Sequence, residues 1–166
     1  MERVAFAGIS SAPVWLALFV GLARALGAPV RLRPRFGPRS LLPALGILNL
    51  GMPLAHEAIH GLVARLIGAR PRYGLGAGFV YTTFEQPVSR NAYLAIGLSP
   101  LLALTGAGLT LLVRFPRFTG QILTFLVGNA AGAAGDVWVA WRVWALPGNA
   151  VIRDLADGFA AYLPEE

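Results

Sequence analysis

The chain has 166 residues, of which 56% are hydrophobic and only 13% are charged, and its formal net charge at pH 7 is +6. Soluble domains usually carry about 25% charged residues, so this composition favours a protein surrounded by lipid. There is no cysteine, which excludes disulfides, thiolate zinc sites and cysteine nucleophiles. All basic residues are arginines at the ends of apolar runs and in the loops between them, as in membrane proteins. We therefore expect no nucleic-acid partner.

Four long apolar segments follow one another along the chain, at about residues 4–28, 41–67, 92–113 and 120–146. Each reaches the roughly 20 residues that a helix needs to cross a bilayer core. The first two are separated by "GAPVRLRPRFGPRS", whose prolines and arginines indicate an exposed loop. The sequence predicts an α-helical integral membrane protein with about four transmembrane helices, forming a single domain over residues 1–166.

A short β element is predicted between the second and third helices. In "RYGLGAGFVYTTFEQPVSR" the larger side chains of Tyr73, Leu75, Tyr81 and Thr83 recur at alternate positions, and glycines occupy the opposite face. This is the period of a strand, so we expect one or two short strands, with a hairpin as one arrangement. Because an open strand edge cannot face lipid, the element should lie at the membrane interface or inside the protein.

The C-terminal stretch "NAVIRDLADGFAAYLPEE" places Val151, Leu155 and Phe159 four residues apart. This spacing predicts a short amphipathic helix that lies on the membrane or on the domain.

The motif "HEAIH" carries the chemistry of the second apolar segment. His56 and His60 are the only histidines of the chain, and on a helix they share a face about 6 Å apart along the axis. They can hold one metal ion, while Glu57 reaches a water on that metal without being a ligand. A catalytic zinc has three protein ligands and a water of lowered pKa, whose proton the glutamate takes and later passes to the leaving amine.

The motif also occurs by chance in soluble proteins, but ionisable groups inside an apolar segment are costly and usually functional. Pro53 suits the first turn of a helix, so we expect a break at residues 51–53, where a new helix starts below the site.

The best candidate for a third zinc ligand is Asp136, the only acid of the fourth apolar segment. It follows "GNAAGAAG", whose small residues let membrane helices approach closely. An alternative is a packing seam in which Asp136 pairs with an arginine. Asp154 and Asp157 are weaker ligand candidates and more typical of a solvated helix face.

Two further features of the fourth segment bear on function. Asn129 lies two turns before Asp136 on nearly the same stripe, where it could hydrogen-bond a substrate carbonyl or oxyanion; an interhelical hydrogen bond explains it equally well. The second feature is a cluster of aromatic and basic side chains that is typical of a membrane-interface anchor. It consists of Trp138, Trp141, Trp144 and Arg142.

The order of these elements resembles a known family. "HEAIHGLVARLIGARPRYGLG", a glycine-rich strand, "LSP" and a distant "GNAAGAAGD" look like the site-2 protease group of intramembrane zinc peptidases. They look even more like a compact group of bacterial membrane proteins, a domain of unknown function called putative zincin peptidases. The resemblance covers roughly residues 50–160, and HEAIH is its one highly specific motif.

By position, the resemblance implies that His56, His60 and Asp136 bind Zn²⁺ and that Glu57 is the general base. It also implies that residues 72–83 present a substrate as an added strand. In that group the HExxH helix runs from outside to inside, which implies cytoplasmic termini. The chain departs from site-2 proteases in having Gly-Asp-Val where they have Leu-Asp-Gly, and it has no PDZ-like domain.

These observations predict a multi-pass zinc metalloprotease of a prokaryotic plasma membrane. It would hydrolyse peptide bonds of peptides or transmembrane proteins at or within the bilayer, through metal-activated water and a glutamate base. The alternative is a non-catalytic metal-binding membrane scaffold or accessory subunit. The two hypotheses differ in whether the bound metal keeps an open coordination position.

Overall fold

The computed structural model describes most of the chain. The described residues are 10–28, 30, 50–76, 80–155 and 158–163. Residues 31–40 of the predicted loop, the first part of the second apolar segment and Asp157 therefore lie outside the described residues.

The chain forms two compact units, which are described separately. One comprises Met1–Met52 and Leu101–Gly135, and the other comprises Pro53–Pro100 and Asp136–Glu166. The long helix α5 (Arg90–Arg114) contributes its first part, up to Pro100, to the second unit and the remainder to the first.

The first unit is helical. It contains α2 (Ala12–Ala25), the short 3₁₀ helix η2 (Pro116–Phe118), α6 (Thr119–Gly132) and the end of α5. Phe19 of α2 and Leu126 of α6 are almost fully buried in its core. Gly108 of α5 leaves the space that the Leu126 side chain fills, because a Cβ at this position would collide with it.

The second unit combines helices with two small antiparallel sheets. Its helices are α4 (Met52–Ile67), the first part of α5 and α7 (Ala134–Trp144). Pro53 occupies the first turn of α4, as its position in the sequence suggested. Phe84, Tyr93 and Ile152 meet in the core of this unit, from a strand, a helix and a second strand.

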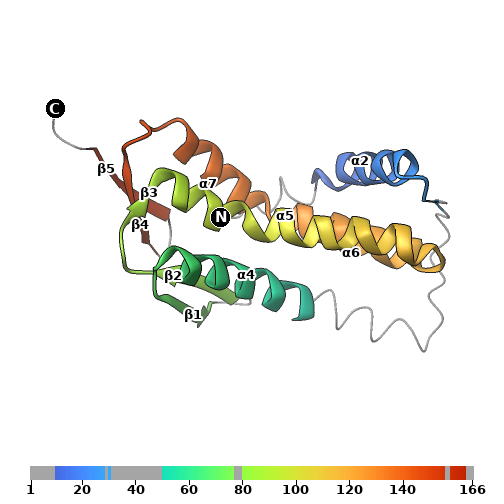
Figure 1. Cartoon of the computed structure of the whole chain (residues 1–166), viewed down its shortest axis with the longest axis horizontal. Coiled ribbons are helices and arrows are strands. Elements are labelled where there is room, and N and C mark those ends of the chain that lie inside the picture. Colours follow the sequence, from blue (N-terminus) through green and yellow to red (C-terminus); the bar gives the residue numbers. More distant parts are fainter. Residues whose placement is uncertain (1–9, 29, 31–49, 77–79, 156–157, 164–166) are drawn as a thin grey trace. The chain divides into compact units, whose positions relative to one another are not determined.

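The β element between the second and third predicted helices is a hairpin. β1 (Pro71–Leu75) pairs antiparallel with β2 (Val80–Phe84), with Tyr73 opposite Thr82 and Gly74 opposite Tyr81. The hairpin lies beside α4 (Figure 1), and Thr82 Oγ1 donates a hydrogen bond of 2.9 Å to the backbone carbonyl of Glu57. This bond fixes the hairpin against the middle of α4.

The prediction of an amphipathic helix at the C-terminus is wrong. β4 (Val151–Leu155) and β5 (Gly158–Tyr162) form an antiparallel pair, and β4 also pairs with β3 (Val88–Ser89). The residue that enters the core is Ile152, which is 0% exposed, whereas Val151 is 37% and Leu155 is 44% exposed. The four-residue spacing of Val151 and Leu155 therefore marks the outer face of a strand, and the pairing with distant Val88 overrides local helical periodicity.

The fourth apolar segment forms two helices. α6 ends at Gly132 and α7 begins at Ala134; between them the N–H of Ala133 donates to the carbonyl of Asn129, at 2.9 Å. Gly132 and Gly135 flank this break, and glycine has low helix propensity. As a result Asp136 lies in the first turn of a helix.

Within the described part of the chain, α5 is the one helix that is long and apolar enough to span a bilayer by itself. The pair α6 and α7 would provide a second span if both were counted as one broken span, and α2 is apolar but shorter. The prediction of four spans stays a prediction.

Substitution of Ile152 tests the strand assignment. Ile152→Ala should destabilise the protein by about 2–5 kcal/mol, because it leaves a cavity in the core. Leu155→Ala, on the exposed face, should cost less than about 1 kcal/mol. Thermal or denaturant unfolding of the two variants measures the difference. Similar losses for both would contradict the strand assignment.

Candidate metal centre

Three of the predicted site residues come from one turn of α4. His56, Glu57 and His60 bring their ligand atoms within 4.8 Å of one another. The two imidazole rings stand edge to face, with centroids 4.9 Å apart. Helical periodicity alone produces this proximity, since positions i and i+4 share a face.

The fourth residue, Asp136, is supplied by α7. Its Oδ2 lies 2.9 Å from His56 Nε2, and its Oδ1 lies 3.7 Å from His60 Nε2. Because the carboxylate sits in the first turn of α7, the positive end of the helix dipole stabilises its charge. The structure therefore brings His56, His60 and Asp136 together, and the arginine-paired alternative for Asp136 is absent among the described residues.

The donor set suits zinc. Tetrahedral ligands about 2.0–2.1 Å from a zinc ion lie roughly 3.3 Å from one another. The two distances from imidazole nitrogen to carboxylate oxygen, 2.9 and 3.7 Å, fall on either side of this value. The three side chains are only 12–28% exposed, so their polar atoms are largely withdrawn from water and need a partner.

His60 is oriented by a backbone group. Its Nδ1 donates a hydrogen bond of 2.9 Å to the carbonyl oxygen of Ile96 in α5. Metal-binding histidines usually donate their second ring N–H in this way, which fixes the tautomer. Ile96 was not identified from the sequence, because nothing in the Ile96 side chain marks its carbonyl as an acceptor.

Asp154, the alternative ligand, is engaged elsewhere. Its carboxylate accepts hydrogen bonds from Thr83 Oγ1 at 2.7 Å and Tyr93 Oη at 2.8 Å. Burial raises the pKa of the Asp154 carboxyl, although these two hydroxyl donors oppose the shift. Asp154 therefore joins β2, β4 and α5, a role that the sequence did not reveal.

Asn129, predicted to contact substrate, belongs to the other compact unit. It is 1% exposed, and its side-chain nitrogen and oxygen have no hydrogen-bond partner among the described residues. The interhelical hydrogen bond considered for it is thus absent there. Its role toward a substrate stays a prediction.

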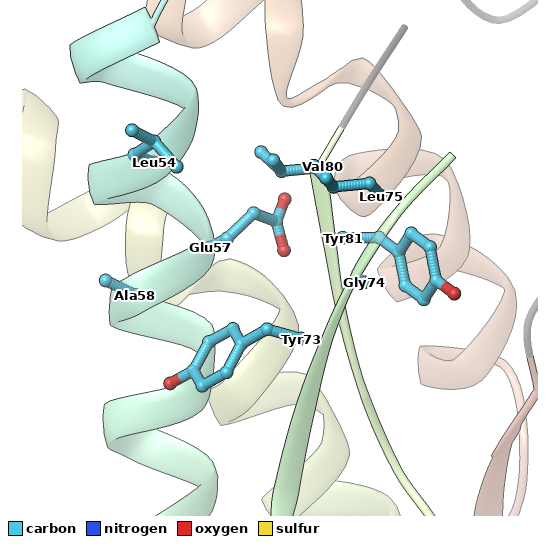
Figure 2. Close-up of a pocket in the computed structure, with 8 residues that line it drawn as sticks. All are labelled: Leu54, Glu57, Ala58, Tyr73, Gly74, Leu75, Val80 and Tyr81. Carbon is cyan, nitrogen blue, oxygen red and sulfur yellow. The ribbon is translucent and has the colours of Figure 1, made fainter. Parts of the chain in front are cut away.

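A pocket of about 580 Å³ opens between α4 and the β1–β2 hairpin. Figure 2 shows the Glu57 carboxylate pointing from α4 into the space in front of the hairpin. Apart from Glu57 the lining side chains are mostly apolar or aromatic, including Leu54, Leu75, Val80 and the two tyrosines Tyr73 and Tyr81. The volume lies within the range of ligand-binding sites.

Two glycines make room for the two tyrosines that line this pocket. A Cβ on Gly61 would collide with the Tyr73 hydroxyl, and a Cβ on Gly74 would collide with the Tyr81 ring. Tyr73 can therefore lie against α4, and Tyr81 can cover the facing strand β1. The sequence placed glycines on one face of this strand. At Gly74 the missing side chain leaves the space that the Tyr81 ring occupies.

Two histidines one turn apart, a glutamate directly after the first and a carboxylate from a second helix have the arrangement expected of a zincin-type metal site. A family model described as "Putative zincin peptidase" matches residues 49–151. The match covers well over half of the chain and includes all four residues of the centre. The chain belongs to this family, whose description is that of a zinc metallopeptidase. Neither a curated protein nor a solved structure matches the chain.

The geometry predicts which carboxylates the metal requires. Asp136→Asn and His56→Ala should each lower zinc affinity strongly if these residues are ligands, because the first removes the negative charge of the donor and the second removes the donor. Asp154→Asn is the matched control: the amide can still pair with both hydroxyls, so the variant should retain about one zinc ion per chain. Metal content of the purified variants, measured by elemental analysis, checks this. Zinc loss in Asp154→Asn with retention in Asp136→Asn would reverse the assignment.

Proposed function

We propose that this protein is a membrane-embedded zinc metallopeptidase, related to site-2 proteases, that hydrolyses peptide bonds at or within the bilayer. The observation that carries the proposal is the contact of the Asp136 carboxylate with both imidazoles of the HExxH motif, in a chain of the zincin peptidase family. This contact would provide three ligands and leave Glu57 beside them as an acid that is not a ligand.

The residues divide the chemistry among them. His56, His60 and Asp136 would hold the zinc ion, which when bound supplies Lewis acidity and lowers the pKa of a coordinated water. Glu57 takes the proton of the attacking water on a carboxylate oxygen. It then delivers this proton to the nitrogen of the leaving amine as the carbon–nitrogen bond breaks.

The pocket in front of Glu57 is the proposed place of the substrate. Its apolar lining favours apolar peptide segments, such as those of transmembrane or juxtamembrane proteins. In the described part of the chain, β1 pairs only with β2, so its outer edge has free backbone groups. An extended peptide could add to this edge as a further strand, with its scissile bond facing Glu57.

The exposed surface supports a lipid environment. On α4, outside the pocket lining, Leu62 and Leu66 are 56% and 77% exposed. Only 22% of the most apolar stretch of α5 is buried, whereas a soluble core helix of this hydropathy would be covered. Exposed apolar surface of this extent marks contact with a membrane or a partner.

The tryptophans of α7 support an anchor at the membrane interface. Trp141 and Trp144 are 67% and 68% exposed. Arg90 lies over the Trp144 ring, with its guanidinium carbon 5.5 Å from the centroid, and Arg142 lies over the Trp138 ring. Aromatic rings with adjacent cations are typical of the headgroup region.

Substitution of Glu57 tests the chemistry. Glu57→Gln should lower peptide hydrolysis by about 10²- to 10⁴-fold, because the amide cannot accept the proton, and should leave zinc content unchanged. Glu85→Gln is the matched control, since Glu85 is exposed and pairs with Arg72 on the surface. Cleavage of apolar peptides and single-span proteins by the zinc-loaded protein, followed by mass spectrometry, measures the effect.

The same measurement separates the alternatives. Full activity of Glu57→Gln would remove Glu57 from the mechanism. Bound zinc without cleavage by the wild type would instead favour the non-catalytic metal-binding scaffold.

The proposed topology has four spans and cytoplasmic termini in a prokaryotic plasma membrane. Because the chain has no cysteine, single introduced cysteines report accessibility cleanly. In intact cells a membrane-impermeant maleimide should label Ser40→Cys, in the predicted outer loop. It should label Glu2→Cys and Glu166→Cys only after permeabilisation. Labelling of the termini in intact cells would contradict this topology.

A further inference from the structure

Helix α5 contains a proline in its interior, at position 100. Proline has no backbone N–H, so it cannot donate to the carbonyl of the residue four positions earlier. Here that residue is Ile96, which is 4% exposed. Its carbonyl has therefore lost its helical partner at a place where little water can replace it, and a buried unpaired carbonyl is costly.

Two side chains satisfy this carbonyl. His60 Nδ1 donates to the Ile96 oxygen at 2.9 Å, and Ser99 Oγ donates at 2.8 Å. A carbonyl oxygen has two lone pairs, so these two bonds complete its capacity. The bond from His60 links α4 to α5, whereas the bond from Ser99 stays within α5.

The bond to Ile96 decides which ring nitrogen of His60 is free. Neutral imidazole carries one N–H; with the proton on Nδ1, the lone pair is on Nε2, the atom that lies 3.7 Å from Asp136 Oδ1. In an uninterrupted α5 the N–H of residue 100 would donate to the Ile96 carbonyl and compete with His60 for it.

We propose that Pro100 is a positioning residue for the metal centre: by freeing the Ile96 carbonyl, it holds His60 in the tautomer and orientation that present Nε2 to the metal. The proposal rests on the assignment of His60 as a metal ligand in the proposed function. Pro100 contributes no atom to the centre and acts through His60.

The experiment compares Pro100→Ala with two controls. Pro100→Ala restores the N–H that competes for the Ile96 carbonyl. Pro13→Ala is the matched proline control, because Pro13 lies in the first turn of α2, where an N–H has no partner within the helix. Ser99→Ala removes the other donor to Ile96 and leaves the bond from His60.

In Pro100→Ala, zinc affinity should fall about 10- to 100-fold, the range for lost outer partners of ligands. The melting temperature of the metal-free protein should stay unchanged or rise, because proline disfavours helix interiors. Pro13→Ala and Ser99→Ala should keep wild-type zinc affinity. Zinc titration against a competing chelator and thermal unfolding in detergent measure both quantities. General damage to the fold would lower affinity and stability together.

The tautomer gives a readout without metal. The chain has two histidines, so ¹⁵N-histidine labelling yields two ring systems, and His56→Ala leaves that of His60 alone. In this background the His60 ring should carry its proton on Nδ1, and adding Pro100→Ala should shift population to the Nε2–H form.

Unchanged zinc affinity, or an unchanged His60 tautomer, in Pro100→Ala would overturn the proposal. If the affinity and tautomer change as expected but the zinc-loaded wild type cleaves no peptide, the proposed function fails and the role of Pro100 stands. If the wild type cleaves peptides and Pro100→Ala behaves as Pro13→Ala does, the proposed function stands and the role of Pro100 fails.

Discussion

The contact between the Asp136 carboxylate and two imidazoles constrains how α4 and α7 are placed in the second unit. The side chains of His56, His60 and Asp136 are mostly withdrawn from water, where an unpaired polar or charged group costs several kcal/mol. They avoid that cost by pairing with one another or with a cation. This requires α4 and α7 to approach closely, and it requires α7 to begin near residue 136, so that the carboxylate is at the helix end that favours negative charge.

The hairpin is tied to this arrangement through two adjacent threonines. Side chains of neighbouring strand residues point to opposite faces. Thr82 accordingly bonds the carbonyl of Glu57 on α4, while Thr83 bonds Asp154 on β4. One short strand thus connects the helix that carries Glu57 to the C-terminal sheet. The pocket wall formed by the hairpin and the position of Glu57 depend on the same strand.

The sequence predicted those features that depend on local periodicity. The spacing in HEAIH suffices to place His56 and His60 on one face of a helix, and the alternation around Tyr81 suffices for a strand. Asp136 could be singled out because it is the one acid in an apolar segment of small residues. The C-terminal strands were missed because their stability comes from pairing with Val88, some sixty residues earlier, which no local pattern reveals.

The hydrogen bonds around the site were also beyond sequence reasoning, with one exception. The bonds of Asp154 depend on which elements meet in three dimensions. A proline inside an apolar helix, by contrast, always frees the carbonyl four residues earlier. Pro100 therefore indicated an available acceptor at Ile96 in the sequence itself, although not the identity of its partner.

Asp136 lies in α7, whereas the two histidines lie in α4. This separation links the binding of a cation to the free energy of assembling the second unit. A pair of imidazoles on α4 can be formed by that helix alone, but the oxygen of Asp136 arrives only when α7 is docked. Any cation that needs all three donors binds the assembled state in preference to the unassembled one, and stabilises it by an amount that grows with the logarithm of free cation concentration. If zinc is that cation, the fraction of assembled protein rises with the concentration of free zinc.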